Sequence, residues 1–199
     1  MKTLSLIRFA RDFSIITCSV LTLSLVHAAA PVTKVFGLPI GGKLSQQLKV
    51  CPSSALGSGA TAKAMCWVDK PFKDKDGTAI GEVVLPNPDG RPEWAAYASF
   101  KAGIGKDGTL KWLNLTDINS SRKSEIANSI SQRFGLPLET TLAQSAASSA
   151  KWLSQGVGIQ QMCSDRLCEV RFTSQAERDA QSLAQDAIYR TNSARPATP

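Results

Sequence analysis

Four cysteines that follow an apolar N-terminal segment constrain the fold of this chain more than any other feature. They are Cys51, Cys66, Cys163 and Cys168. An even number of cysteines in an exported chain indicates disulfides, and four cysteines allow three pairings. The short separations along the chain favour Cys51 with Cys66 and Cys163 with Cys168. We therefore expect two local covalent links that hold a small domain in shape.

The N-terminal segment predicts export. Basic residues precede the apolar run of residues 15–26, and Val26-His27-Ala28 is typical of a cleavage site. The run is shorter than the roughly 20 residues that a membrane span needs. We therefore predict a signal peptide over residues 1–28 and no membrane span after its cleavage. An uncleaved membrane anchor is the alternative.

Cleavage after Ala28 narrows the kinds of site that the chain can build. It removes His27, the only histidine of the sequence. A Ser-His-Asp or Cys-His catalytic site needs an imidazole that titrates near neutral pH, and catalytic zinc sites nearly always use His ligands. Both classes are excluded for the mature chain, and we expect neither a metal nor a cofactor. Hydrolases that use two carboxylates, binding proteins and structural proteins are left.

The charge of the chain limits the kind of partner. Cleavage removes three of the 23 basic and one of the 16 acidic residues, which lowers the formal net charge from +7 to +5. This charge is spread along the chain without a recognition motif or a dense basic stripe, so we expect no nucleic-acid partner. Another protein or an anionic envelope polymer fits better, in the periplasm or outside the cell.

The segment around Cys163 and Cys168 predicts a hairpin closed by a disulfide. Strand-like sequences lie on both sides, and Ser-Asp-Arg-Leu between the cysteines is typical of a turn. Cysteines that face each other across antiparallel strands lie close enough for a disulfide. The alternatives are a redox centre, which needs the spacing C-x-x-C, and a metal clamp, which needs thiolates that an oxidising compartment removes. We favour the disulfide.

Two helices are indicated by apolar residues that recur with helical spacing. Over residues 120–137, Ile126 and Ile130 share one face, and the Gly-Leu-Pro sequence at the end stops the helix. Residues 174–190 begin with the capping sequence Ser-x-x-Glu and carry a stripe of Ala, Leu and Ile that includes Leu183. We expect the stripe to be buried.

Strand-like segments occupy much of the remaining sequence. Residues 109–118 alternate between apolar and polar side chains, which predicts a strand. Residues 93–104 can form a strand or a helix: aromatic residues recur there every three positions, as in a helix, but the Pro and Gly that flank them favour a strand. A short third helix is predicted near residues 43–49. The sequence thus predicts an α+β fold, an antiparallel sheet with two or three helices packed on one face and stapled by disulfides. We expect a single domain over residues 29–190 and a disordered tail over 191–199.

The sequence Phe-Gly-Leu-Pro occurs twice, at residues 36–39 and 134–137. Similar residues follow both copies without a gap, as a duplication into two similar halves would leave them. We favour coincidence over duplication, because a Gly-x-Pro stop is common wherever a regular element ends.

Two groups of residues are candidates for a binding surface. Trp94, with Arg91 and Glu93, lies in or beside a loop rich in Pro, Asn, Asp and Gly, and it is the tryptophan that we most expect to be exposed. The second group combines lysines with aromatic residues, as anion- and sugar-binding platforms do. Its members are Trp67, Lys70, Phe72 and Lys73.

These features favour an exported, non-catalytic protein that binds another protein or a component of the cell envelope, and no catalytic residue is assigned. One alternative is a hydrolase of cell-wall glycan that uses two carboxylates, with Glu82, Asp89 and Glu93 as candidates. Another is an accessory subunit of an envelope or secretion machine.

Overall fold

The computed structural model describes residues 33–56, 62–86, 91–141 and 147–193. The predicted signal peptide and residues 194–199 of the predicted tail lie outside these ranges. Within them, none of the helices is long and apolar enough to cross a membrane.

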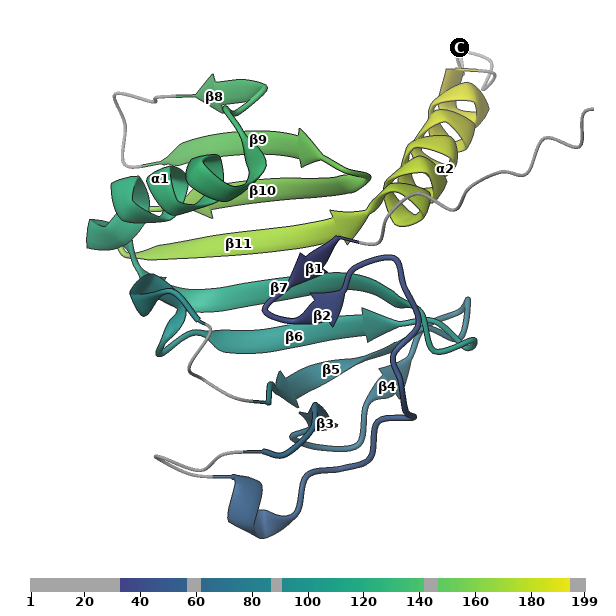
Figure 1. Ribbon diagram of the computed structural model, residues 1–199. Helices are drawn as coiled ribbons and strands as arrows, with labels where there is room; N and C mark the ends of the chain where they lie inside the picture. The colour runs from purple at the N-terminus through teal and green to yellow at the C-terminus, as the bar shows by residue number, and fades with distance from the viewer. Residues whose placement is uncertain (1–32, 57–61, 87–90, 142–146, 194–199) are drawn as a thin grey trace, which may run out of the picture.

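A nine-stranded antiparallel sheet forms the body of the structure (Figure 1). Its strands are β3 (Cys66–Trp67), β4 (Phe72–Lys73), β5 (Ala79–Val84), β6 (Ser99–Ile104), β7 (Leu110–Asn119), β8 (Glu139–Thr141), β9 (Ser148–Ser154), β10 (Val157–Cys163) and β11 (Leu167–Ser174). They lie in the order β3-β5-β6-β7-β11-β10-β9-β8, and β4 pairs with β5. Two meanders, β5-β6-β7 and β9-β10-β11, thus meet where β7 pairs with β11.

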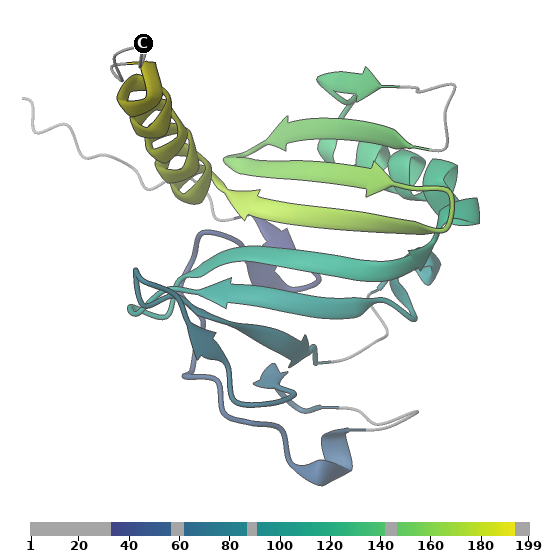
Figure 2. The ribbon, with the colours of Figure 1, turned by 180° about the vertical axis from the view of Figure 1, so that it is seen from behind.

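Smaller elements flank this sheet or cover one of its faces. They are the strands β1 (Lys34–Val35) and β2 (Leu38–Pro39), the 3₁₀ helices η1 (Ser53–Ala55), η3 (Glu93–Ala95) and η4 (Ser120–Arg122), and the helices α1 (Lys123–Phe134) and α2 (Gln175–Ser193). Figure 1 shows α1 and the β1–β2 hairpin in front of the sheet, and Figure 2 shows no helix across the opposite face. The fold is therefore predominantly antiparallel sheet with two α-helices.

The core lies between the sheet and these covering elements. Successive residues of a strand point to opposite faces, so alternate apolar residues form a continuous layer on one side. On the central pair, Leu113 lies opposite Phe172 and Leu115 opposite Val170. All four side chains are buried. Such a layer on one face is the usual arrangement for an antiparallel sheet that leaves its other face to solvent.

The uncovered face of the sheet carries Trp112 and several charged side chains. Trp112 lies over Gly103 on the neighbouring strand, where a Cβ atom would come within 2.2 Å of the indole nitrogen. The guanidinium carbon of Arg171 lies 4.9 Å from the centroid of the Trp112 ring. Lys101 lies opposite Glu82, and Lys151 forms an ion pair with Glu139 at 2.8 Å. Basic and acidic side chains thus alternate there.

Helix α1 forms as its sequence predicts. Ile126 and Ile130 lie one turn apart and are buried against the sheet. The indole nitrogen of Trp152 on β9 donates a hydrogen bond to Ser131 Oγ at 3.1 Å. Gly135 follows the helix with φ of +92°, a conformation that glycine adopts without a steric penalty.

The predicted buried stripe of α2 is wrong. Ser174 does cap the helix, because its Oγ accepts a hydrogen bond from the backbone N–H of Glu177 at 3.2 Å. However, Ala176 and Ala180 are exposed, and Leu183 is 71% exposed. Figure 1 shows α2 leaving the sheet at the end of β11. A stripe made mostly of alanine offers little apolar area, so its burial would stabilise the helix only weakly.

We expected two or three helices to pack on one face of the sheet, and of these only α1 does so in the described structure. Near the start of α2, Lys111 forms an ion pair with Glu177 at 3.3 Å, and the Arg178 side chain lies over Gly158 on the uncovered face. The third helix predicted near residues 43–49 does not form. Its backbone pairs with the turn before β7 instead, where Leu44 N–H donates to Gly108 O at 3.0 Å.

Both predicted disulfides are confirmed. Cys51 bonds to Cys66 with a Cα–Cα distance of 5.1 Å, and Cys163 bonds to Cys168 with a Cα–Cα distance of 4.0 Å. Cys163 lies directly opposite Cys168 in the β10–β11 ladder, as the hairpin prediction requires. The turn between them is closed by a hydrogen bond from Ser164 N–H to the carbonyl oxygen of Leu167 at 2.8 Å.

We expect the unreduced protein to have a mass four hydrogens below that of the reduced chain, two for each disulfide. Intact-mass spectrometry before and after reduction measures the difference directly. Digestion without reduction should also yield Cys51 linked to Cys66 and Cys163 linked to Cys168. Four alkylatable thiols in the unreduced protein would contradict both bonds.

The hypothesis of two similar halves is not confirmed. The first Phe-Gly-Leu-Pro sequence makes the turn and second strand of the β1–β2 hairpin, whereas the second follows from the end of α1. The similarity after the second copy extends into residues 142–144, which lie outside the described residues. Each meander is followed by a helix, but α1 packs on the sheet and α2 does not.

Candidate binding pocket

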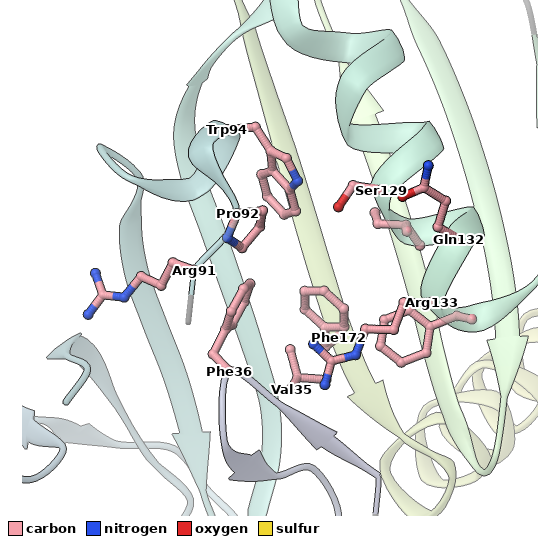
Figure 3. Close-up of a pocket in the computed structure, with 11 residues that line it drawn as sticks. Val35, Phe36, Arg91, Pro92, Trp94, Ser129, Gln132, Arg133 and Phe172 are labelled. Carbon is pink, nitrogen blue, oxygen red and sulfur yellow. The ribbon is translucent and has the colours of Figure 1, made fainter. Parts of the chain in front are cut away.

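A pocket of about 440 Å³ lies on the covered side of the sheet, between the β1–β2 turn, the segment 91–94, α1 and β11 (Figure 3). Its apolar lining comes from Val35, Phe36, Pro92, Trp94, Ile130, Phe134 and Phe172. Its polar lining comes from Arg91, Ser129, Gln132 and Arg133. The volume falls within the range typical of small-ligand sites.

Phe36 stands at the centre of the aromatic lining. Its ring centroid lies 6.0 Å from that of Phe172 and 6.4 Å from that of Trp94, in both cases edge to face. Its φ of +50° is unusual for a residue with a side chain, and Gly37 follows with φ of +78°. Two successive positive φ angles are typical of the tight turn in a two-residue β-hairpin. The hairpin thus holds the Phe36 ring against the sheet.

Trp94 carries a buried donor without a partner. The residue is 5% exposed, and its indole Nε1 has no hydrogen-bond partner in the part of the chain that the structure describes. Such an unpaired buried donor costs about 1–3 kcal/mol. Figure 3 shows the indole nitrogen directed toward the Ser129 side of the pocket. The expectation that Trp94 is exposed is wrong, because Phe36 and α1 cover it.

Arg91 lines the pocket with its aliphatic stem, while its guanidinium points away from Trp94 and Phe172 (Figure 3). Its Nη2 donates to the carbonyl oxygen of Leu85 at 2.8 Å, and its Cζ lies 4.9 Å from the Phe100 ring centroid. Burial lowers the pKa of Arg91 from its usual value. An arginine side chain nevertheless keeps its charge in proteins. These contacts attach the segment 91–94 to the sheet.

Arg133 reaches from α1 toward Val35 at the mouth of the pocket (Figure 3). Its Nη2 donates to the carbonyl oxygen of Lys34 at 2.7 Å, and its Cζ lies 5.4 Å from the Phe134 ring centroid. Ser129 lies one helical turn before Arg133 and therefore on the same face of α1. The lining contains two arginines and no carboxylate.

Glu93 lies outside the pocket. It is exposed and accepts a hydrogen bond from Arg122 at 3.1 Å, and Arg122 also lies 3.4 Å from Glu125. The hydrogen bond to Glu93 is the main cause that raises the pKa of Arg122. This ion pair links η3 to the start of α1, so Glu93 positions the wall that carries Trp94.

The second predicted group lies at the other end of the sheet, on and between β3 and β4. Trp67 is 4% exposed and packs on Gly81, where a Cβ atom would lie 3.2 Å from its ring. Phe72 is 63% exposed, and Lys70 and Lys73 are also exposed. This group therefore presents one exposed aromatic ring with two lysines, and the structure does not bring it together with Trp94.

Sequence reasoning found Arg91 and Trp94 but missed the other residues of the pocket. Ser129 and Arg133 flank the Ile126–Ile130 stripe of α1, so the helix prediction already placed them beside the core. Phe172 is part of a strand whose apolar alternation predicts burial but not a neighbouring pocket. Phe36 lies in a tight turn, which the glycine that follows it indicates.

Comparison with models of protein families, with curated proteins and with solved structures finds no match to this chain. No group of three or more His, Cys, Asp or Glu side chains in the described ranges is arranged to hold a metal ion.

Proposed function

We propose that this chain is an exported, non-catalytic binding protein of the cell envelope, and that it holds an apolar group of another protein or of an envelope component in the pocket beside Trp94. The observation that carries the proposal is the unpartnered N–H of the buried Trp94 at an open, aromatic pocket. A bound acceptor would offset the cost of leaving this donor unpaired.

The composition of the lining supports binding over catalysis. Ligand pockets are commonly apolar and aromatic with a few polar groups that orient the ligand. Here Ser129 is the one hydroxyl of the lining, and neither an imidazole nor a carboxylate accompanies it. A serine nucleophile would need a base within hydrogen-bond reach to remove its proton.

The glycan hydrolase stays a prediction from sequence alone. It requires two carboxylates about 5–9.5 Å apart across the scissile bond. Glu82 lies on β5 opposite Lys101, and Glu93 on η3 is engaged by Arg122. Asp89 lies outside the described residues. An accessory subunit of an envelope machine would use the same pocket for a protein partner.

A periplasmic or secreted location is part of the proposal. Two disulfides are compatible with an oxidising compartment, where such bonds form and persist. The predicted signal peptide supports the same location.

We expect the neutral fluorescent probe N-phenyl-1-naphthylamine to bind the purified mature protein with a Kd of about 1–100 μM, because an apolar aromatic body fits a pocket of this size. Replacing Ser129 with phenylalanine fills the pocket from α1 and should weaken binding at least about tenfold. Probe fluorescence measures the affinity, and circular dichroism establishes that the variant is folded.

Asn128→Phe is the matched control, because Asn128 is the preceding residue of α1, is exposed and does not line the pocket. It should leave the affinity unchanged. If Ser129→Phe does not fold, Gln132→Phe tests the same wall from an exposed position. Equal binding by the wild type and a folded pocket-filling variant would overturn the proposal, and so would an absence of probe binding to the wild type.

A further inference from the structure

We infer that the pocket selects an apolar molecule or chain end that carries a carboxylate, with Trp94 Nε1 and Ser129 Oγ as the donors to the anion and Arg133 as a positive charge at the mouth of the pocket. The inference rests on the proposed function, since it names the ligand class for the same pocket. Three features of the lining support it: the direction of two donors, the position of a cation and the shape of the apolar surface.

Two donors converge on one part of the pocket. Trp94 Nε1 is buried and unpartnered in the described structure, and an indole nitrogen can only donate. Figure 3 shows this nitrogen and the Ser129 hydroxyl directed toward each other from η3 and α1. An oxygen atom placed between them accepts from both. A carboxylate oxygen has the lone pairs for two such bonds, and its charge makes each of them stronger than a bond to a neutral acceptor.

The charge of the lining favours an anion over a neutral acceptor. Arg133 has five N–H donors, and its Nη2 contacts the carbonyl oxygen of Lys34. No residue of the lining supplies a negative charge, and both ion pairs of Arg122 lie outside the pocket. Arg133 and Ser129 share a face of α1 one turn apart. Figure 3 shows the Arg133 guanidinium at the Val35 end of the pocket, so its charge attracts an anion into the pocket without contacting the two donors.

The apolar part of the ligand would lie against the aromatic rings. The ring centroids of Phe36 and Phe134 lie 6.0 and 6.2 Å from that of Phe172. Together with Val35 they form a surface without a polar side-chain atom. A ligand with an aromatic or branched aliphatic body buries its area there while its carboxylate reaches the donors. This chemistry belongs equally to a small free acid and to the last residue of a partner chain.

The test compares an acid with its amide of nearly the same shape. 1-Naphthylacetate and 1-naphthylacetamide are used to displace N-phenyl-1-naphthylamine from the mature protein. The acid should bind about tenfold tighter than the amide, as a charge-assisted hydrogen bond implies. In the ¹⁵N–¹H spectrum, the indole signal that disappears in Trp94→Phe should move downfield with the acid, because its N–H becomes a hydrogen-bond donor.

Arg133→Gln should reduce the preference for the acid to below about threefold while leaving the affinity for the amide unchanged. Arg166→Gln removes the same charge from the exposed β10–β11 turn and should change neither affinity. An equal affinity for acid and amide in the wild type would overturn the inference, and so would an unchanged preference in Arg133→Gln. In both cases binding of the neutral probe would leave the proposed function standing.

A second pair of ligands distinguishes the two sources of the carboxylate. Acetyl-Gly-Gly-Phe with a free carboxyl end is compared with the same peptide as its amide. If the peptide acid displaces the probe more strongly than the peptide amide does, the result supports a chain end as the ligand. If naphthylacetate displaces the probe but the peptide acid does not, the result supports a small free acid. If neither acid exceeds its amide, the pocket does not select carboxylates.

Discussion

Replacing Phe172 with alanine is expected to lower the free energy of unfolding by about 3–5 kcal/mol, the largest effect of any single substitution considered for this protein. Phe172 is 2% exposed and lies opposite Leu113 where the two meanders meet. Its ring also contacts Phe36 and Phe134 at centroid distances of 6.0 and 6.2 Å. The lost side chain therefore leaves a cavity at the centre of the core.

Urea denaturation followed by circular dichroism measures this loss. Phe72→Ala is the matched control, because the same side chain is removed from a position that is 63% exposed. That variant should stay within about 0.5 kcal/mol of the wild type. A loss below about 1 kcal/mol for Phe172→Ala would mean that the covering hairpin and helix do not form one core with the sheet.

Removing the Cys51–Cys66 disulfide is expected to have the second largest effect. The double variant Cys51→Ala/Cys66→Ala should lose about 3 kcal/mol in the free energy of unfolding, because the bond closes a loop with a sequence separation of 15. The two cysteines form a small separate cluster with Ala55 and Ala62, against which only Val84 packs among the described residues. Little apolar burial is available there to replace the covalent link.

The measurement is again denaturant unfolding, here under non-reducing conditions with the Cys163–Cys168 bond intact. Ser54→Ala changes an exposed residue inside the same loop and should stay within about 0.5 kcal/mol of the wild type. A double variant as stable as the wild type would show that the disulfide does not restrict the unfolded chain.

The elements that could be predicted well from the sequence are those whose structure depends on residues close together along the chain. The hairpin around Cys163 and Cys168 combines alternating strands with turn residues, and α1 combines the Ile126–Ile130 spacing with a glycine stop. Both depend on interactions within a few positions along the chain. The disulfide pairing could be predicted for the same reason, because the two cysteines of each pair lie close together along the chain.

The elements that sequence could not specify depend on distant surfaces. The helical period of α2 predicts an apolar stripe but says nothing of whether a surface exists to receive it, and Leu183 is exposed. The composition around Trp94 resembles an exposed loop, yet Phe36 from one end of the chain and α1 from its middle bury the ring. The pocket itself needs four segments to meet. Only tertiary packing sets such positions.

The place of β11 in the sheet determines when the core can close. This strand is the last of the described strands and lies in the middle of the strand order, so β7 has no second neighbour until residues 167–174 pair with it. The entropy of closing the loop between β7 and β11 opposes their pairing until the contacts between the two strands have formed. A chain shortened before β11 would hold the meander β5-β6-β7 and the strands β8-β9-β10, with β7 and β10 as unpaired inner edges. The order of the strands thus makes closure of the sheet depend on β11, and a variant that weakens this strand would expose the inner edges of β7 and β10 together.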